Sequence, residues 1–139
     1  MTLKELSGYY DTLVLVNALK DEISHMETCA RGLVANYNGI SSGGGGKTDN
    51  VSAQAEKLIA HREKLSVLLA RAEEERIQID KYIFEEVAND DKLIASMMYH
   101  RFIKLRTWYQ VAYDVGGNNT ADSCRMAVLR YVRSRKETE

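Results

Sequence analysis

Residues 36–50, NYNGISSGGGGKTDN, separate two long stretches in which apolar residues recur every three or four positions. Four consecutive glycines lose too much backbone entropy on ordering to be comfortable inside a helix. We therefore expect a flexible loop at about residues 37–50, with a helix on each side of it. This arrangement predicts a long antiparallel helical hairpin.

The two stretches beside the loop both have the period of an α-helix. The first runs from Leu3 to about Asn36 and the second from Val51 to about Val87. A hairpin of two helices buries only one seam, whereas the apolar run Leu13–Val16 covers nearly the whole circumference of the first helix. Such a surface is an association liability unless a copy of the chain covers it. We expect a homodimer or a higher oligomer formed through the hairpin.

Composition narrows the class of protein. The chain has 139 residues and no proline, which favours long helices and short turns, and we expect an all-α fold. No apolar run approaches the ~18 residues that span a bilayer. The first residues lack the charged and apolar regions of a secretory signal. We therefore expect a cytoplasmic protein, without a membrane partner, whose two cysteines stay reduced.

Charge divides the chain into two parts. Residues 1–91 carry 10 Lys and Arg against 16 Asp and Glu, a net charge of −6, whereas residues 92–139 carry 9 against 4, a net charge of +5. An acidic front joined to a basic tail predicts two roles. We assign residues 1–89 to the hairpin, as an oligomerisation or docking arm, and residues 90–139 to a small basic unit.

The basic unit is predicted to hold three helices. Asn89-Asp90-Asp91 offers a cap for the first, whose apolar face comprises Leu93, Ile94, Met97, Met98, Phe102 and Ile103. Thr107 and Gln110 match a capping box, so a short second helix is expected to run to Val115 and to stop at Gly116-Gly117. Asn119 or Thr120 can cap the last helix, from about Thr120 to Arg135. Its inward residues are expected to be Ala121, Cys124, Val128 and Val132, with Leu129 as a further candidate.

The second and third of these helices have the features of a helix-turn-helix unit. Ala112 is small enough for a close helix crossing, and Gly116 follows four residues later at the turn. In such a unit the last helix enters the major groove and presents its N-terminal residues to the base edges. The predicted partner is double-stranded DNA.

Several residues of this unit are candidates for DNA contact. Arg125 can fork onto a guanine, and Asn118 and Asn119 can either pair with adenine or cap the helix. The other candidates at the start of the last helix are Thr120, Ser123 and Met126. Five basic residues are expected on phosphates: Arg101, Lys104, Arg106, Arg130 and Arg133. The alternative is a three-helix module with a solvated basic face.

Other chemistry has weak support in the sequence. Gly46-Lys47-Thr48 ends like a phosphate-binding loop, but Ser41 stands where that motif needs its first glycine, and no strand precedes it. His25 and Cys29 lie four residues apart, which is at most half of a metal site. We find no nucleophile and base pair either. We expect no enzyme activity, no cofactor and no metal.

A resemblance to a known family lies in three segments, Tyr99–Ile103, Thr107–Ala112 and Gly116–Arg125. In these segments the sequence resembles the RinA/ArpU-like late-gene transcription regulators of phages and prophages. The C-terminal part of these proteins is similar to region four of bacterial sigma factors. The resemblance implies a DNA-binding regulator of phage genes that acts near a promoter in a bacterial host cell, with RNA polymerase as a second candidate partner. It also implies that Trp108 packs at the start of the helix-turn-helix and that residues 118–126 face the groove.

Two alternatives remain open at this point. The chain can be a helical protein–protein interaction adaptor or inhibitor, in which the basic unit meets an acidic protein surface. It can also be the small subunit of a phage DNA-packaging machine, because those proteins join a helix-turn-helix to an oligomerising helical arm. A basic face shared by Arg125, Arg130 and Arg133 with Lys104 and Arg106 favours nucleic acid, whereas dispersed charges favour the adaptor.

Overall fold

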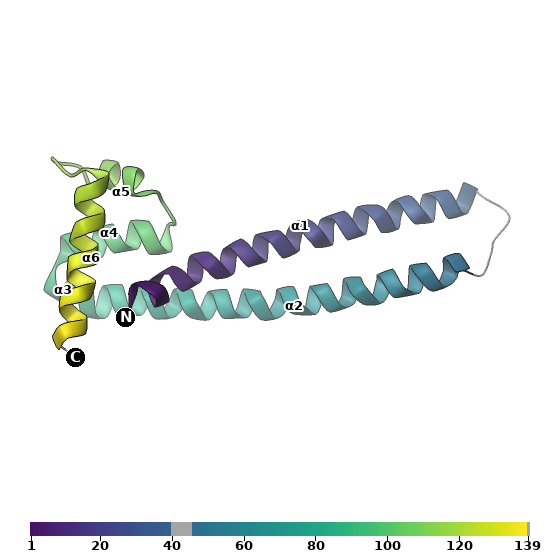
Figure 1. Ribbon diagram of the computed structural model, residues 1–139, viewed down its shortest axis with the longest axis horizontal. Coiled ribbons are helices and arrows are strands. Elements are labelled where there is room, and N and C mark those ends of the chain that lie inside the picture. The colour runs from purple at the N-terminus through teal and green to yellow at the C-terminus, as the bar shows by residue number, and fades with distance from the viewer. Residues whose placement is uncertain (40–45, 139) are drawn as a thin grey trace. The chain divides into compact units, whose positions relative to one another are not determined.

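The computed structural model describes residues 1–39 and 46–138, and every regular element in these ranges is helical (Figure 1). The predicted all-α fold class is confirmed. In chain order the elements are α1 (Leu3–Gly39), α2 (Gly46–Tyr82), the π-helical turn η1 (Ile83–Val87), α3 (Ala88–Asp90), α4 (Lys92–Met98), the π-helical turn η2 (Tyr99–Ile103), α5 (Trp108–Val115) and α6 (Ala121–Thr138).

The break between α1 and α2 is shorter than the loop expected at residues 37–50. Helix α1 continues to Gly39, and α2 already begins at Gly46, which is the last of the four glycines. Extending an existing helix costs far less than starting one, so weak helix formers are tolerated at the ends of two long helices. The other three glycines, at positions 43–45, lie outside the described residues.

The chain forms two compact units. The hairpin unit comprises Leu13–Ala70, and the helix-cluster unit comprises Met1–Thr12 together with Arg71–Glu139. The boundary expected at residues 89 and 90 does not coincide with this division. The reason is packing, because the start of α1 and the end of α2 share a hydrophobic core with the C-terminal helices.

In the hairpin unit, α1 and α2 lie antiparallel. Leu15 and Leu19 share a surface groove with Val67 and Leu68, whereas Cys29, further along α1, shares a groove with residues 54 and 55, which come earlier in α2. An ion pair joins Arg62 Nη2 to Glu27 Oε1 at 2.7 Å.

Few side chains of the hairpin unit are buried. Val16 and Ile23 are the buried hydrophobic residues among its described side chains. Leu13, Leu19 and Leu58 of this unit are half-buried, and Leu69 is exposed. Two helices therefore do not form a closed core on their own.

The helix-cluster unit contains one continuous hydrophobic core. It is built from residues of α1, α2 and every later helical segment except α3, whose Ala88 packs against it: Leu6, Ile79, Tyr82, Ile83, Val87, Ile94, Ala95, Met97, Met98, Phe102, Ile103, Val111, Ala112, Cys124, Val128 and Val132. Five of the six residues predicted for the inward face of residues 93–103 belong to it. The exception is Leu93, which is 49% exposed in the first turn of α4.

The Glu75 carboxylate of α2 lies against the start of α1. A Cβ atom on Gly8 would lie 2.6 Å from Glu75 Oε2, so a larger residue there would displace the end of this flexible side chain. The same carboxylate accepts a hydrogen bond from Thr12 Oγ1 at 2.6 Å. Gly8 thus leaves room for the carboxylate, and Thr12, the one buried polar residue among the described side chains, is satisfied there.

The π-helical turns replace the continuous α-helices that the sequence predicts. In η1 the backbone N–H of Ala88 donates to the carbonyl of Ile83, five residues earlier, and in η2 Lys104 donates to Tyr99 at 3.0 Å. Core residues Ile79, Ile83 and Val87 repeat every four residues. In an α-helix this spacing drifts by about 40° per step, and a wider turn removes the drift.

None of the helices in the described ranges contains an apolar stretch long enough to cross a lipid bilayer.

The fold makes a testable prediction about Leu6, which is fully buried although it lies near the start of α1. Leu6→Ala should lower the free energy of unfolding by about 2–5 kcal/mol, because the cavity forms in the core shared with the C-terminal helices. Leu93→Ala, the same deletion at an exposed site, should cost only about 0.5 kcal/mol. Urea unfolding followed by the fluorescence of Trp108, which packs against this core, measures both. Equal effects would place Leu6 outside the core.

Candidate nucleic-acid interface

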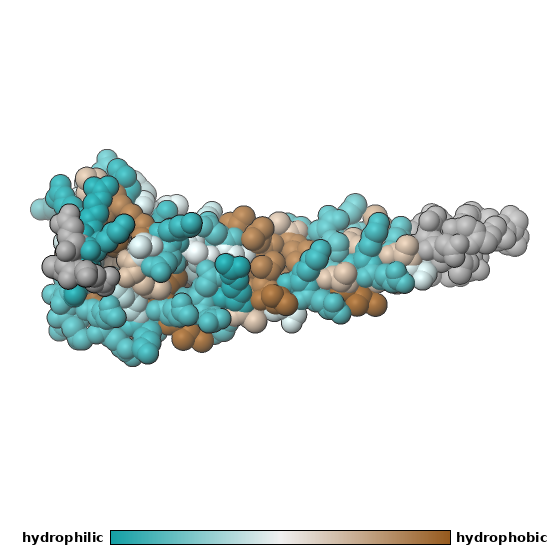
Figure 2. All heavy atoms as spheres, turned by 60° about the horizontal axis from the view of Figure 1, so that its bottom comes forward, coloured by the Kyte–Doolittle hydropathy of each residue, from teal (hydrophilic) through white to brown (hydrophobic). Residues whose placement is uncertain are grey.

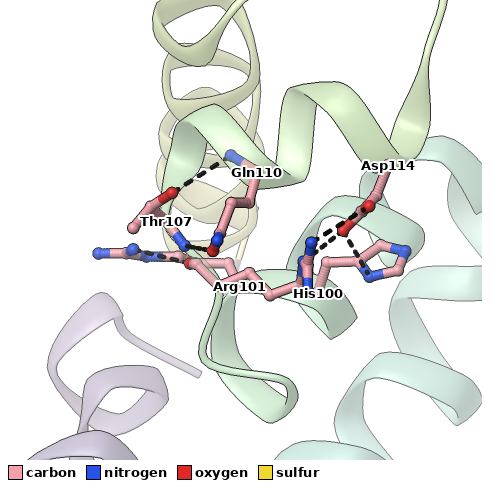
Figure 3. Close-up of polar contacts among 6 residues, drawn as sticks. His100, Arg101, Thr107, Gln110 and Asp114 are labelled. Atoms are coloured by element: carbon pink, nitrogen blue, oxygen red, sulfur yellow. Dashed lines mark hydrogen bonds and ion pairs between the residues drawn. The ribbon is translucent and has the colours of Figure 1, made fainter.

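Helix α5 begins at the capping box that the sequence predicts. Thr107 Oγ1 accepts a hydrogen bond from the backbone N–H of Gln110 at 3.2 Å, and Gln110 Oε1 accepts one from the backbone N–H of Thr107 at 3.1 Å (Figure 3). The two bonds satisfy donors that the first turn of a helix leaves free. Helix α5 runs from Trp108 to Val115, and Val111 and Ala112 are buried on its inner face.

The turn after α5 depends on two glycines. Gly116 and Gly117 have φ angles of 75° and 68°, in a region where a side chain is strained. Asn119 Nδ2 donates a hydrogen bond to the carbonyl of Gly116 at 2.9 Å. The Asn119 amide therefore supports the turn, whereas Asn118 is exposed.

Helix α6 is capped by Thr120, one of the two residues expected to do so. Thr120 Oγ1 accepts from the backbone N–H of Ser123 at 3.1 Å, and Ser123 Oγ accepts from the backbone N–H of Thr120 at 2.8 Å. Both hydroxyl groups are thus engaged in the cap, although both residues are exposed. The helix extends to Thr138, beyond the expected end at Arg135.

The inner face of α6 anchors the helix in the core. Cys124 and Val128 are fully buried, and Val132 is 5% exposed. Burial raises the pKa of the Cys124 thiol, since the thiolate would lose its hydration, and the Ser123 side chain partly opposes this effect. Cys124 is therefore a packing residue, as expected. Ala121, the fourth predicted inward residue, is half-buried.

The opposite side of α6 carries two exposed arginines. Arg130 and Arg133 lie three residues apart, about 60° around the helix from each other, and Met126 lies between them in angle. We call Met126, Arg130 and Arg133 the outer α6 face. Among the described side chains, neither arginine forms an ion pair. Asp122, one turn before Met126, is exposed at the start of the same side.

Arg106 is placed in an ion-pair cluster. Its guanidinium contacts the Asp114 carboxylate, through Nε to Oδ2 and through Nη2 to Oδ1 at 3.4 Å. His100 Nδ1 lies 3.8 Å from the same carboxylate (Figure 3). Asp114 thus already compensates the charge that was expected on a phosphate.

Arg101 is held against an aromatic ring. Its guanidinium lies 5.0 Å from the centre of the Trp108 ring, and its Nη1 donates to the carbonyl of Arg106 at 2.9 Å. Both contacts fix the side chain on the segment that leads into α5. Trp108 is half-buried at the start of α5.

Two other cations of the basic part differ in their surroundings. Lys104 is exposed, with its Nζ 5.7 Å from the centre of the Tyr99 ring. Arg135 pairs with Asp90, which also accepts a hydrogen bond from the Tyr131 hydroxyl at 3.0 Å. Burial, followed by the charges of Tyr82, Glu86 and Asp91, raises the pKa of Tyr131.

Arg125 is exposed but does not lie on the outer α6 face. It lies about 140° around the helix from Arg130. There it lines a groove together with Arg101 and Trp108. The cations predicted for one DNA surface are thus divided between the outer α6 face, the groove and the Asp114 cluster.

Two exposed aromatic residues were not among the predicted site residues. Tyr109 and Tyr113 are 79% and 83% exposed on the outer side of α5. The helical period contained the signal, because a helix that buries Val111 and Ala112 must turn positions 109 and 113 outward.

The described residues contain no group of three or more His, Cys, Asp or Glu side chains placed to hold a metal ion. Cys29 Sγ lies 3.6 Å from His25 Nε2 on α1, so this pair stands as an isolated contact.

No protein-family model matches the chain, and neither a curated protein nor a solved structure is detectably similar to it.

The cap of α6 gives a prediction about the contribution of Thr120 to the stability of the protein. Thr120→Ala should lower the free energy of unfolding by about 1 kcal/mol, because the N–H of Ser123 loses its acceptor. Thr120→Ser keeps a hydroxyl in place and should retain most of the stability. Urea unfolding of the two variants and the parent provides the measurement. Equal stability of all three would remove the capping role.

Proposed function

We propose that the chain is a DNA-binding transcription regulator of the phage type and that α5, the glycine turn and α6 act on duplex DNA as a helix-turn-helix. The support is local geometry. Helix α5 has a complete capping box, the turn is short and contains glycines, and α6 is capped and anchored by Cys124 and Val128. A rigid pair of helices of this kind can present one exposed face of α6 to the major groove.

The observation that carries the proposal is the outer α6 face. Arg130 and Arg133 are exposed there, and no carboxylate among the described side chains pairs with them. Unpaired guanidinium groups on one face of a helix are suited to phosphates, to which Arg binds through two parallel hydrogen bonds. Asn118, exposed in the turn, is the proposed base-reading residue, because Asn can pair with adenine through both atoms of its amide.

The proposal gives other predicted DNA residues supporting roles. Asn119, Thr120 and Ser123 hold the turn and the cap, and Arg101 and Arg106 hold the segment before α5. Through these bonds the five residues shape the unit, and they are not its proposed DNA contacts. We further propose, in line with the sequence resemblance, a cytoplasmic protein without enzyme activity that acts near a promoter, with RNA polymerase as a second partner.

The DNA proposal is tested by fluorescence anisotropy on a random duplex at about 50 and 200 mM salt. Each phosphate contact releases counterions, so a protein with several contacts should lose orders of magnitude in affinity over this range. The double variant Arg130→Ala/Arg133→Ala should reduce the slope of log affinity against log salt by about 2, since each arginine accounts for about one phosphate.

The matched control is the double variant Lys20→Ala/Arg31→Ala, which removes the same two positive charges from exposed positions of the hairpin unit. This variant should bind like the parent protein. If the parent fails to bind at 50 mM salt, or if the control weakens binding as much as the double variant does, the DNA proposal is wrong.

We propose a second copy of the chain as the partner of the hairpin unit. Leu15 and Val67 are 57% and 68% exposed and line one apolar groove, and Val14 and Ile59 are 49% and 56% exposed. Figure 2 shows hydrophobic side chains on the surface of the long helices, between hydrophilic ones. Two copies of the hairpin related by a two-fold axis would form a four-helix bundle and bury this surface.

Charge at the groove suits a self-complementary interface. Glu63 and Lys64 are neighbours in the lining of the groove, so the same surface offers both signs of charge. Across a two-fold axis, the cation of one copy can meet the anion of the other. A partner that is uniformly acidic or uniformly basic would form a favourable charge pair with only one of these two residues.

Val67→Glu should convert the proposed dimer into a monomer, because it places a charge in the apolar groove. Ser66→Glu adds the same charge at the neighbouring exposed position outside the groove lining and should leave the dimer intact. Light scattering at micromolar concentration gives the masses, and circular dichroism verifies the helix content. A monomeric parent protein would refute the dimer.

A helical adaptor or inhibitor is the second candidate function, and the division of the predicted cations between the outer α6 face, the groove that Arg125 lines and the Asp114 cluster favours it. It predicts tight binding to an acidic protein and no affinity for duplex DNA, so the anisotropy experiment separates the two. The small subunit of a DNA-packaging machine would also bind duplex DNA. It differs from a regulator in having no effect on transcription from a phage promoter.

A further inference from the structure

The helix-cluster unit contains a groove that neither the DNA proposal nor the dimer proposal uses. Its volume is about 440 Å³, which lies within the range of about 300–1,000 Å³ typical of small-molecule sites. The lining comes from the start of α1, from η2 and the segment after it, and from α5 and α6: Leu3, Ser7, Tyr10, Arg101, Phe102, Leu105, Thr107, Trp108, Arg125 and Leu129.

The charge of this groove is positive. Arg101 and Arg125 both line it, and no acidic residue is among its lining residues. Arg125 forms no ion pair among the described side chains. Arg101 donates one N–H to the carbonyl of Arg106, and a guanidinium has five N–H donors. Two guanidinium groups in one concave site therefore have donors left for an anion.

The rest of the lining is mostly apolar and aromatic. The Phe102 ring meets the Trp108 ring edge to face, with 6.4 Å between centres and 89° between planes. Leu3 and Leu129 add aliphatic surface, and the Ser7 and Thr107 side chains add hydroxyl groups. A ligand that fits this lining has a flat apolar part beside its charge.

The backbone at one edge of the groove is held in an uncommon conformation. Leu105 has a φ angle of 58°, and it is the only residue other than glycine with a positive φ among the described residues. This conformation is unfavourable for a residue with a Cβ atom. The bond from Arg101 to the Arg106 carbonyl stabilises the segment, so the same arginine both shapes the groove and charges it.

We propose that this groove binds a planar organic anion, with its carboxylate or phosphate group at Arg101 and Arg125 and its flat apolar part beside Trp108. A DNA backbone is a poorer occupant, because a phosphodiester chain gains nothing from the leucine and tryptophan surfaces. The site does not depend on DNA binding, and it turns Arg125, a predicted base reader, into a ligand-binding residue.

The chain itself provides the reporter for a test, because Trp108 is its only tryptophan. Its indole N–H gives a single resonance in a 15N-labelled sample of the full chain. The probes are 1-naphthoate, 1-naphthyl phosphate and the neutral 1-naphthamide. We expect either anion to shift the resonance in a saturable manner, with a dissociation constant at least about tenfold lower than that of the amide. The two anions distinguish a carboxylate ligand from a phosphate ligand.

Variants at one position separate charge from packing. Arg125→Ala should abolish the preference for the anions over the amide, whereas Arg125→Lys should keep part of it because the charge remains without the fork. Arg133→Ala removes an exposed arginine of the same helix outside the groove and should leave all three titrations unchanged. If the indole resonance does not move, if anions and amide bind equally, or if Arg133→Ala acts like Arg125→Ala, the proposal is wrong.

Discussion

The shared core of the helix-cluster unit is the constraint on which its other features depend. Leu6 of α1, Ile83 of η1 and Val128 of α6 are fully buried in one cluster, although they are far apart in the chain. Burial of apolar side chains is the dominant favourable term in folding. This core fixes which side of each short helix faces inward, and the exposed residues of α5 and α6 follow from that choice. The small C-terminal helices therefore pack on the start of α1 and the end of α2.

Polar side chains around this core are divided between supporting and exposed positions. Thr107, Gln110, Thr120 and Ser123 satisfy the backbone at the starts of α5 and α6. Loss of such a cap costs about 1 kcal/mol, so these side chains contribute to stability in the places where they are. The exposed Arg130 and Arg133 cap no helix, so their guanidinium groups are better suited to contacts with a partner.

Local features of the sequence predicted local structure well. The capping box at Thr107, the glycine stop at Gly116 and the N-cap at Asp91 all depend on contacts between residues a few positions apart, and all three are present. The inward residues of α6 follow from helical spacing alone. These elements could be predicted because the interactions that form them lie within one turn of the chain.

The boundary of the compact unit could not be predicted in this way. It depends on Leu6 and the end of α2 packing with α4, α5 and α6, and helical periodicity does not tell which helix faces which. The two π-helical turns were missed for a related reason. Over a short stretch, a repeat of four residues is compatible with one face of an ordinary α-helix. The wider turn is favourable only because it lets Ile79, Ile83 and Val87 all pack in one core.

The candidate DNA contacts were predicted by residue type, which does not show how the fold surrounds each side chain. Spacing along the chain cannot show that Arg106 meets Asp114 or that Arg101 stacks on Trp108, since each contact crosses the bend before α5. These contacts change the meaning of the basic composition. The net positive charge of residues 92–139 is the same whether their arginines are paired with carboxylates or not. However, only an arginine without such a partner gains binding free energy when it meets a phosphate or a carboxylate of a ligand. The function of this unit thus depends less on how many cations it has than on which of them the fold leaves without an anion.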